Sequence, residues 1–196
     1  MQPNRHTKRE IQTQNHAKKK TVNYIERDEE ERAEYLKELE EIPKELRIYI
    51  DETGKNTGLD RTHGYAPKGE KVEGKTHGKK QDKLNIVAAK CGEDILEVHE
   101  YGCSMNSRLF EFWFMLLLKC VLPGHWFIMD NARFHREKVL REMAETAGCH
   151  LLMLPKYSPD LNPIESEWAN LKRFLRDYGR DYQLVSDAVF HYFNSA

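Results

Sequence analysis

Three acidic residues lie at the ends of predicted strands or at the start of a predicted helix, where proteins with a β-sheet commonly have their functional sites. Asp51 and Asp130 each follow a short hydrophobic run, and Glu165 lies in the first turn of a segment with helical periodicity. Ligands of open α/β sheets bind at the carboxyl ends of the strands, so Asp51 and Asp130 are candidates to converge there. Carboxylate oxygens suit Mg²⁺ or Mn²⁺. Two such ions activate a water or a 3′-hydroxyl and stabilise the leaving oxygen of a phosphodiester.

Each acid also has a purely structural interpretation. Asp51 and Asp130 could be turn residues, since Asp-Glu-Thr-Gly and Asp-Asn both favour turns. Glu165 could complete a capping box, with Asn162 as the N-cap and Pro163 at the first helical position. The neighbouring acids that compete for a metal-binding role are Glu52, Asp160 and Glu167. Spacing alone leaves these interpretations open.

Three strings around these acids are more specific than the spacing. In chain order they read Tyr-Ile-Asp51-Glu-Thr-Gly, Met-Asp130-Asn-Ala-Arg-Phe-His135 and Tyr-Ser-Pro-Asp-Leu-Asn-Pro-Ile-Glu165, with 34 residues between Asp130 and Glu165. With these strings, the chain over about residues 24–196 resembles the catalytic domain of mariner-type transposases of the DDE superfamily, most closely their bacterial insertion-sequence branch. Residues 64–69, Gly-Tyr-Ala-Pro-Lys-Gly, also resemble a segment between the family's first two strands.

The resemblance implies a ribonuclease H-like fold and a metal-dependent DNA transposase that hydrolyses phosphodiesters and transfers strands at transposon ends. Asp51, Asp130 and Glu165 would then be the catalytic residues and would bind two Mg²⁺ (or Mn²⁺) ions. Asn131 and His135 match the family's motif around the second aspartate. We interpret Asn131 as support for the metal ligands, and His135 as such support, as a DNA contact or as a helix-start residue. The implied partners are the terminal inverted repeats and target DNA, bound by a homodimer.

Charge is segregated along a chain whose net charge is only −1. Residues 1–20 hold six basic groups and one acid, residues 26–46 hold ten acids, and residues 55–90 hold nine basic groups against four acids. The first block has almost no apolar residues, which predicts a basic, disordered arm over residues 1–25. The third block is rich in Gly and Lys and is either a solvated face or a loop that contacts DNA phosphates. The predicted phosphate contacts are Lys68, Lys71, Lys75, Lys79 and Lys80.

Hydrophobic patterning predicts the elements that must position the acids. Strands are expected at residues 46–50, 84–89, 95–99, 126–129 and 150–154. Helices are expected at residues 26–41, 107–122, 135–147, 162–178 and from 182 into the C-terminus. This order indicates an α/β fold with a mixed five-stranded sheet flanked by helices.

Several core assignments follow from the same patterning. The first helix has a thin apolar stripe of Ala33, Leu36 and Leu39, and the helix at 107–122 is apolar nearly all round, which predicts burial. Tryptophans on apolar faces are also expected in the core, namely Trp113, Trp126 and Trp168.

One domain over residues 26–196 is predicted to follow the arm. Full-length members of the resembled family carry N-terminal helix-turn-helix units, for which the residues before Glu26 have no apolar periodicity. We therefore expect either the catalytic part of a split transposase, with a separate recognition subunit, or a fragment of a decayed element. The alternative function is a catalytically incompetent remnant that acts as a DNA-binding or interaction module. A third candidate is a ribonuclease H-like nuclease of another kind.

Composition argues against membrane and disulfide-rich classes. The most apolar stretch, residues 109–122, has 14 residues including Glu111 and Lys119, whereas a membrane span needs about 20 apolar residues. The N-terminus has no apolar signal region. Four cysteines without C-x-x-C spacing predict buried, reduced thiols. These features lead us to expect a cytoplasmic protein, and the resemblance implies that it is bacterial and associated with the nucleoid when bound to DNA.

Overall fold

The computed structural model describes residues 25, 27–56 and 83–195, with the backbone alone for Lys55, Asn56 and Lys83. The predicted basic arm lies outside the described residues, except for Ile25. The segment 64–69 and the five lysines predicted to contact phosphates, Lys68 to Lys80, also lie outside them.

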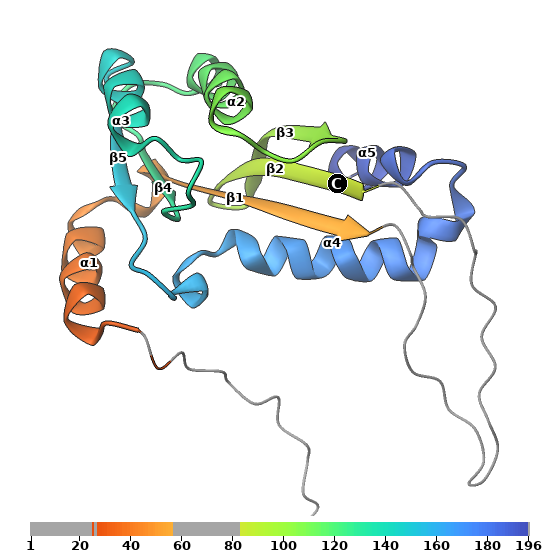
Figure 1. Cartoon of the computed structure of the whole chain (residues 1–196), viewed down its shortest axis with the longest axis horizontal. Coiled ribbons are helices and arrows are strands. Elements are labelled where there is room, and N and C mark those ends of the chain that lie inside the picture. Colours follow the sequence, from red (N-terminus) through yellow and green to blue (C-terminus); the bar gives the residue numbers. More distant parts are fainter. Residues whose placement is uncertain (1–24, 26, 57–82, 196) are drawn as a thin grey trace, which may run out of the picture.

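Within the described residues, five strands form one mixed sheet in the order β3-β2-β1-β4-β5 (Figure 1). The first three strands form an antiparallel meander, and the last two run parallel to β1. Their bounds are Arg47–Asn56 for β1, Lys83–Cys91 for β2, Asp94–Tyr101 for β3, Trp126–Met129 for β4 and His150–Met153 for β5. The predicted α/β class, the mixed five-stranded sheet and the order of the strands along the chain are therefore confirmed.

The α-helices of the described part of the chain flank this sheet on both faces (Figure 1). Their bounds are Glu29–Glu41 for α1, Ser107–Cys120 for α2, Glu137–Thr146 for α3, Ile164–Tyr178 for α4 and Val185–Asn194 for α5. Helices α2 and α3 pack on one face, over Ile48 and Ile50 of β1. Helices α4 and α5 pack on the other face over β2, and α1 covers β4 and β5 beside them. A site on β1 is thus bordered by two different layers.

Three details of the predicted packing are wrong. Helix α1 buries Tyr35 and half-buries Leu39, whereas Ala33 and Leu36 are exposed. Helix α2 buries only the side that faces the sheet, because it covers a single layer, and it leaves Phe112 and Met115 exposed. Of the cysteines, all of which are free thiols, only Cys149 is buried.

The tryptophans follow the prediction more closely. Trp113 and Trp168 are 1% exposed, and Trp126 is half-buried and stacks on His150. Among the described helices, none has the length and apolar character needed to cross a membrane.

Candidate active site

Strand β1 delivers two neighbouring acids to opposite faces of the sheet. The pleat places Ile48 and Ile50 in the core beneath α2 and α3, and the same alternation sends Asp51 toward α4. There the indole Nε1 of Trp168 donates a hydrogen bond to Oδ2 of Asp51, at 2.9 Å. Glu52 points to the other face, beside His135.

The prediction that Asp51 ends its strand, or begins a turn, is wrong. Strand β1 continues to Asn56, because β2 pairs with it from Ile48 to Asn56. The parallel pairing with β4, however, stops at Tyr49. Asp51 therefore still lies just beyond the carboxyl edge of the parallel pair, where a site was expected.

Asp130 directly follows β4 and is held by local hydrogen bonds. Its Oδ1 accepts a hydrogen bond from the backbone N–H of Ala132 at 3.2 Å, which is the Asx-turn interpretation of this residue. The Nδ1 atom of His135 lies 2.8 Å from the backbone oxygen of Asp130 and 3.2 Å from its Oδ1. The turn and a role in a site are compatible, because together these contacts orient a carboxylate whose side chain is 56% exposed.

The capping-box interpretation of Glu165 is wrong. Helix α4 begins at Ile164 without a side-chain hydrogen bond at its cap, and the backbone N–H of Asn162 donates to the carbonyl of Pro159. The Nδ2 of Asn162 instead donates to the carbonyl of Ile50 in β1, at 3.2 Å. This bond ties the start of α4 to the strand that carries Asp51.

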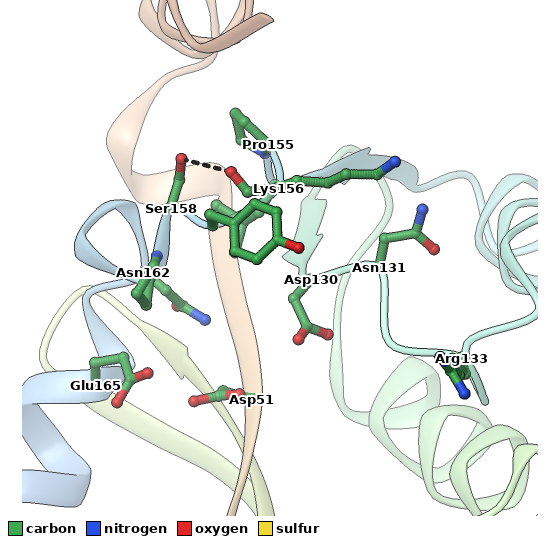
Figure 2. A pocket seen from close by; sticks show the side chains of 12 residues that line it. Asp51, Asp130, Asn131, Arg133, Pro155, Lys156, Ser158, Asn162 and Glu165 are labelled. Carbon is green, nitrogen blue, oxygen red and sulfur yellow. Dashed lines mark hydrogen bonds between the residues drawn. The ribbon is translucent and has the colours of Figure 1, made fainter. Parts of the chain in front are cut away.

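The three predicted carboxylates line one cavity of about 820 Å³, together with Asn131 and Asn162. Figure 2 shows the side chains of Asp51, Asp130 and Glu165 pointing toward a common space, from β1, the end of β4 and the start of α4. The structure thus brings the predicted triad together. It also places Asn131, which is exposed, on the cavity wall.

The negative charge of Asp51 is not fully compensated by the groups that contact this carboxylate. Burial, with the nearby charges of Glu165 and Glu52, raises the pKa of Asp51 from 3.8 to about 7. The backbone hydrogen bond at Glu52 and the indole of Trp168 lower this pKa only in part. The group therefore favours either a bound proton or a nearby cation.

The donor set fits a hard divalent cation. Asn162 is only 5% exposed, and its Oδ1 has no hydrogen-bond partner among the described residues. Because Asn162 lines the same cavity as the three carboxylates, its unpaired amide oxygen offers a neutral oxygen donor beside three anionic ones. Magnesium and manganese prefer such oxygen ligands.

His135 supports the site from the opposite layer. Its side chain is 1% exposed and packs against the rings of Phe110 and Phe134, with centroid distances of 4.2 and 4.5 Å. Its Nε2 lies 3.3 Å from Oε1 of Glu52. Burial lowers the pKa of His135, but the hydrogen bonds to Asp130 and Glu52 outweigh it and raise this pKa to about 9.

This burial contradicts two of the three interpretations of His135. A side chain without accessible surface cannot contact DNA directly, and α3 starts two residues later, at Glu137. One ligand atom from each of Glu52, Asp130 and His135 lies within 4.8 Å of the others. A protonated imidazole has no lone pair to offer a metal, so we interpret this group as an ion-pair cluster that orients Asp130.

The competing acids have structural partners. Glu52 pairs with His135, and Glu167 accepts a hydrogen bond from the hydroxyl of Tyr192 at 2.6 Å. Asp160 binds Arg32, with 3.1 Å between Nη1 and Oδ1, and this hydrogen bond lowers its pKa. Each therefore has a cation or a hydroxyl that accounts for its position.

Sequence reasoning missed several residues of the cavity wall. They are Arg133, Lys156, Tyr157 and Ser158. All lie in the loops that follow β4 and β5, inside or next to the strings that contain Asp130 and Glu165. Basic residues in the loops after the predicted strands at 126–129 and 150–154 were the signal that could have found the first two. Trp168 was assigned to the core, which is correct, but its indole also binds Asp51.

The strand order, with acids from β1, the end of β4 and the start of α4, defines a ribonuclease H-like catalytic core. Residues 47–187 match the family described as DDE superfamily endonuclease, and the chain belongs to this family. No curated protein matches the chain significantly. The bacterial insertion-sequence branch stays a prediction.

Solved structures show the same fold at low sequence identity. The Mos1 strand transfer complex has a TM-score of 0.67 and 16% identity over 92% of this chain and 59% of its own. The Mos1 transposase paired-end complex has a TM-score of 0.63 and 15% identity over 81% of this chain and 53% of its own. The Mos1 mariner catalytic domain has a TM-score of 0.57 and 14% identity over 85% of this chain and 78% of its own. The chain thus spans little more than half the length of the first two.

Proposed function

We propose that residues 26–196 are the catalytic domain of a DNA transposase that hydrolyses phosphodiesters and transfers strands at transposon ends. The observation that carries the proposal is the convergence of Asp51, Asp130 and Glu165 on one cavity. Membership of the DDE endonuclease family supports DNA cleavage as the reaction. One similar Mos1 structure is a paired-end complex with the left transposon end and another is a pre-cleavage transpososome, which supports the terminal inverted repeats as substrate and paired ends held by a homodimer.

The proposed cofactor is a divalent cation, Mg²⁺ or Mn²⁺, with two ions in the site. Similar Mos1 complexes are described with Mg and with Mn. Asp51, Asp130 and Glu165 would hold the ions, with Oδ1 of Asn162 as a further oxygen donor. When bound, such ions lower the pKa of an attacking water or 3′-hydroxyl and offset charge on the leaving oxygen.

The chain's own contribution is to hold these donors in place before substrate arrives. Trp168 fixes one oxygen of Asp51, and the bond from Asn162 to Ile50 fixes the start of α4 next to it. Ala132 and His135 fix Asp130. Preorganised ligands lose little conformational freedom on binding, which favours both affinity and rate.

A decisive experiment compares cleavage with binding. The full chain is incubated with Mn²⁺ and linear DNA taken from both sides of its own gene, because those flanks would contain the ends. We expect nicks at a defined position with the wild type and none with Asp130→Asn, which should still bind this DNA. Glu145→Gln, at an exposed acid of α3, is the matched control and should cleave normally.

Two results would contradict the proposal. Cleavage that persists in Asp130→Asn would mean that another site cuts the DNA. A wild type that binds these flanks but never cleaves them, alone or with a recognition subunit, would favour the catalytically incompetent remnant.

A further inference from the structure

We infer that Arg133 and Lys156 form a binding site for the DNA phosphates that flank the scissile one. This inference rests on the proposed function and adds the surface along which the bound DNA strand extends away from the three carboxylates. The predicted phosphate contacts, Lys68 to Lys80, lie outside the described residues and are not used in this inference.

Both residues belong to the wall of the catalytic cavity. Arg133 comes from the loop between β4 and α3, and Lys156 from the loop that follows β5. Figure 2 shows them on the side of the cavity away from Glu165, with Asn131 between them and Asp130 at the centre. The cavity therefore has acids along one side and basic residues along the other.

The two basic side chains have no internal partner to explain them. Both residues are exposed, and neither side chain has an ion pair or hydrogen bond with any described residue. Arg136, three positions after Arg133, contrasts with this because it forms a bidentate pair with Glu111. Basic groups held at a cavity without a protein anion are free to bind an external one.

The charge pattern selects a phosphate as that anion. A DNA strand whose scissile phosphate lies at the three carboxylates must extend along the adjoining wall. Its next phosphates would lie beyond direct contact with cations bound at the acids, so basic side chains there supply the contact that the cations do not. A guanidinium and an ammonium are the usual protein partners of phosphate oxygens.

The loop that carries Lys156 has a defined shape and an aromatic neighbour. The hydroxyl of Ser158 donates to the carbonyl of Lys156 at 3.2 Å, the bond drawn in Figure 2. Tyr157 has a φ of 56°, in the left-handed region, and its ring is exposed at the cavity. Basic residues beside an exposed aromatic ring are typical of surfaces that bind a single strand, because bases can stack on the ring.

The test measures the salt dependence of DNA binding. All proteins carry Asp130→Asn so that the DNA stays intact, and fluorescence anisotropy of a labelled duplex from the gene's flank is recorded over a series of KCl concentrations from low to physiological and above. Removing one phosphate-binding side chain should reduce the slope of log Kobs against log [K⁺] by about 0.9. We expect this change for Arg133→Gln and for Lys156→Gln, and about twice this change for the double variant. The control is Lys119→Gln, at an exposed lysine near the C-terminal end of α2 that does not line the cavity, which should not change the slope.

The outcomes separate this inference from the proposed function. Unchanged slopes for both variants, while the otherwise wild-type protein cleaves the same DNA, overturn the inference alone. Reduced slopes without any cleavage by that protein support the phosphate site and contradict the proposed transposase activity. No measurable binding by the parent at the lowest salt concentration overturns the inference.

Discussion

Two adjacent acids of β1, Asp51 and Glu52, meet opposite environments. Glu52 faces the α2–α3 layer, where the buried imidazole of His135 lies 3.3 Å away and carries a positive charge near neutral pH. Asp51 faces the α4 layer, where its neighbours are a neutral indole N–H from Trp168 and a second acid, Glu165. The negative charge of Glu52 is compensated by a cation of the protein, and the negative charge of Asp51 is not.

The difference indicates how to distinguish a structural carboxylate from one that awaits a ligand. Sequence type and position are nearly the same for these two residues, and both are half-buried. The distinction depends on the layer that covers each face of the sheet. The loop before α3 supplies the cation of His135 to Glu52, whereas α4 supplies a further anion, Glu165, to Asp51. Burial and Glu165 accordingly raise the pKa of Asp51 to about 7. A bound divalent cation would remove this excess.

The largest expected difference between the two acids is in metal affinity. Asp51→Asn removes a proposed ligand, so we expect the affinity for Mn²⁺ to fall more than about 100-fold, beyond the usual effect of an outer-shell change. Glu52→Gln should reduce the affinity by only about 10-fold, since it acts through His135 and Asp130. Electron paramagnetic resonance of free Mn²⁺ measures both affinities without DNA. Equal losses in the two variants would contradict the assignment of Asp51 as a ligand.

The second expected difference concerns stability. Here the larger effect is expected on the face of Glu52 rather than on the face of Asp51. His135→Leu leaves Glu52 without its buried partner, and breaking such a pair costs about 3–5 kcal/mol in the free energy of unfolding. Urea denaturation of the single variants and of the double variant with Glu52→Leu measures the coupling. The double variant should recover much of the loss. Strict additivity of the two single effects would show that the pair is not coupled.

The same pair predicts a pH window. The pKa of His135 is raised from 6.5 to about 9 in the folded protein, where hydrogen bonds to Asp130 and Glu52 outweigh the effect of burial. Its stabilising contribution is therefore complete below pH 6.5 and is lost as the pH rises through about 9. Wild type and His135→Leu should differ less in stability above this window than below it. A difference independent of pH would mean that packing alone explains the variant.

Elements with strong local patterns were predictable from the sequence. Strand β4 was predicted with its observed bounds, and β5 within one residue, because each is a short apolar run with a breaker beside it. The positions of Asp51 and Asp130 after hydrophobic runs indicated that these two acids could converge, and the family resemblance implied Glu165 as the third. Family resemblance then distinguished these acids from their neighbours, which spacing alone did not.

Features that depend on distant residues were not predictable in this way. The length of β1 depends on its pairing with β2, a strand that begins only after the long segment between Asn56 and Lys83. Glu52 and His135 are 83 positions apart, and the amide of Asn162 reaches Ile50 across 112 positions. Local propensity favoured Asn162 as a helix cap, and a bond to the neighbouring strand replaced that role. Tertiary contacts thus decided which polar residues support the site.

The smallest expected effect is also the one that most directly tests the charge excess at Asp51. In the folded protein its pKa is raised from 3.8 to about 7, so ionising this carboxyl costs stability, fully above about pH 7 and not at all below pH 3.8. Asp51→Asn should therefore make the protein more stable in EDTA above about pH 7. The expected gain is about 1–2 kcal/mol, after allowance for solvent screening of a half-buried group. Below pH 3.8 the substitution should leave the stability unchanged. Saturating Mn²⁺ should reverse this order, because only the wild type gains the full binding free energy of the ion. Thermal melts of both proteins with and without Mn²⁺ measure this reversal of their relative stability. If the variant is less stable than the wild type in EDTA at alkaline pH, the negative charge of Asp51 is compensated within the protein, as that of Glu52 is.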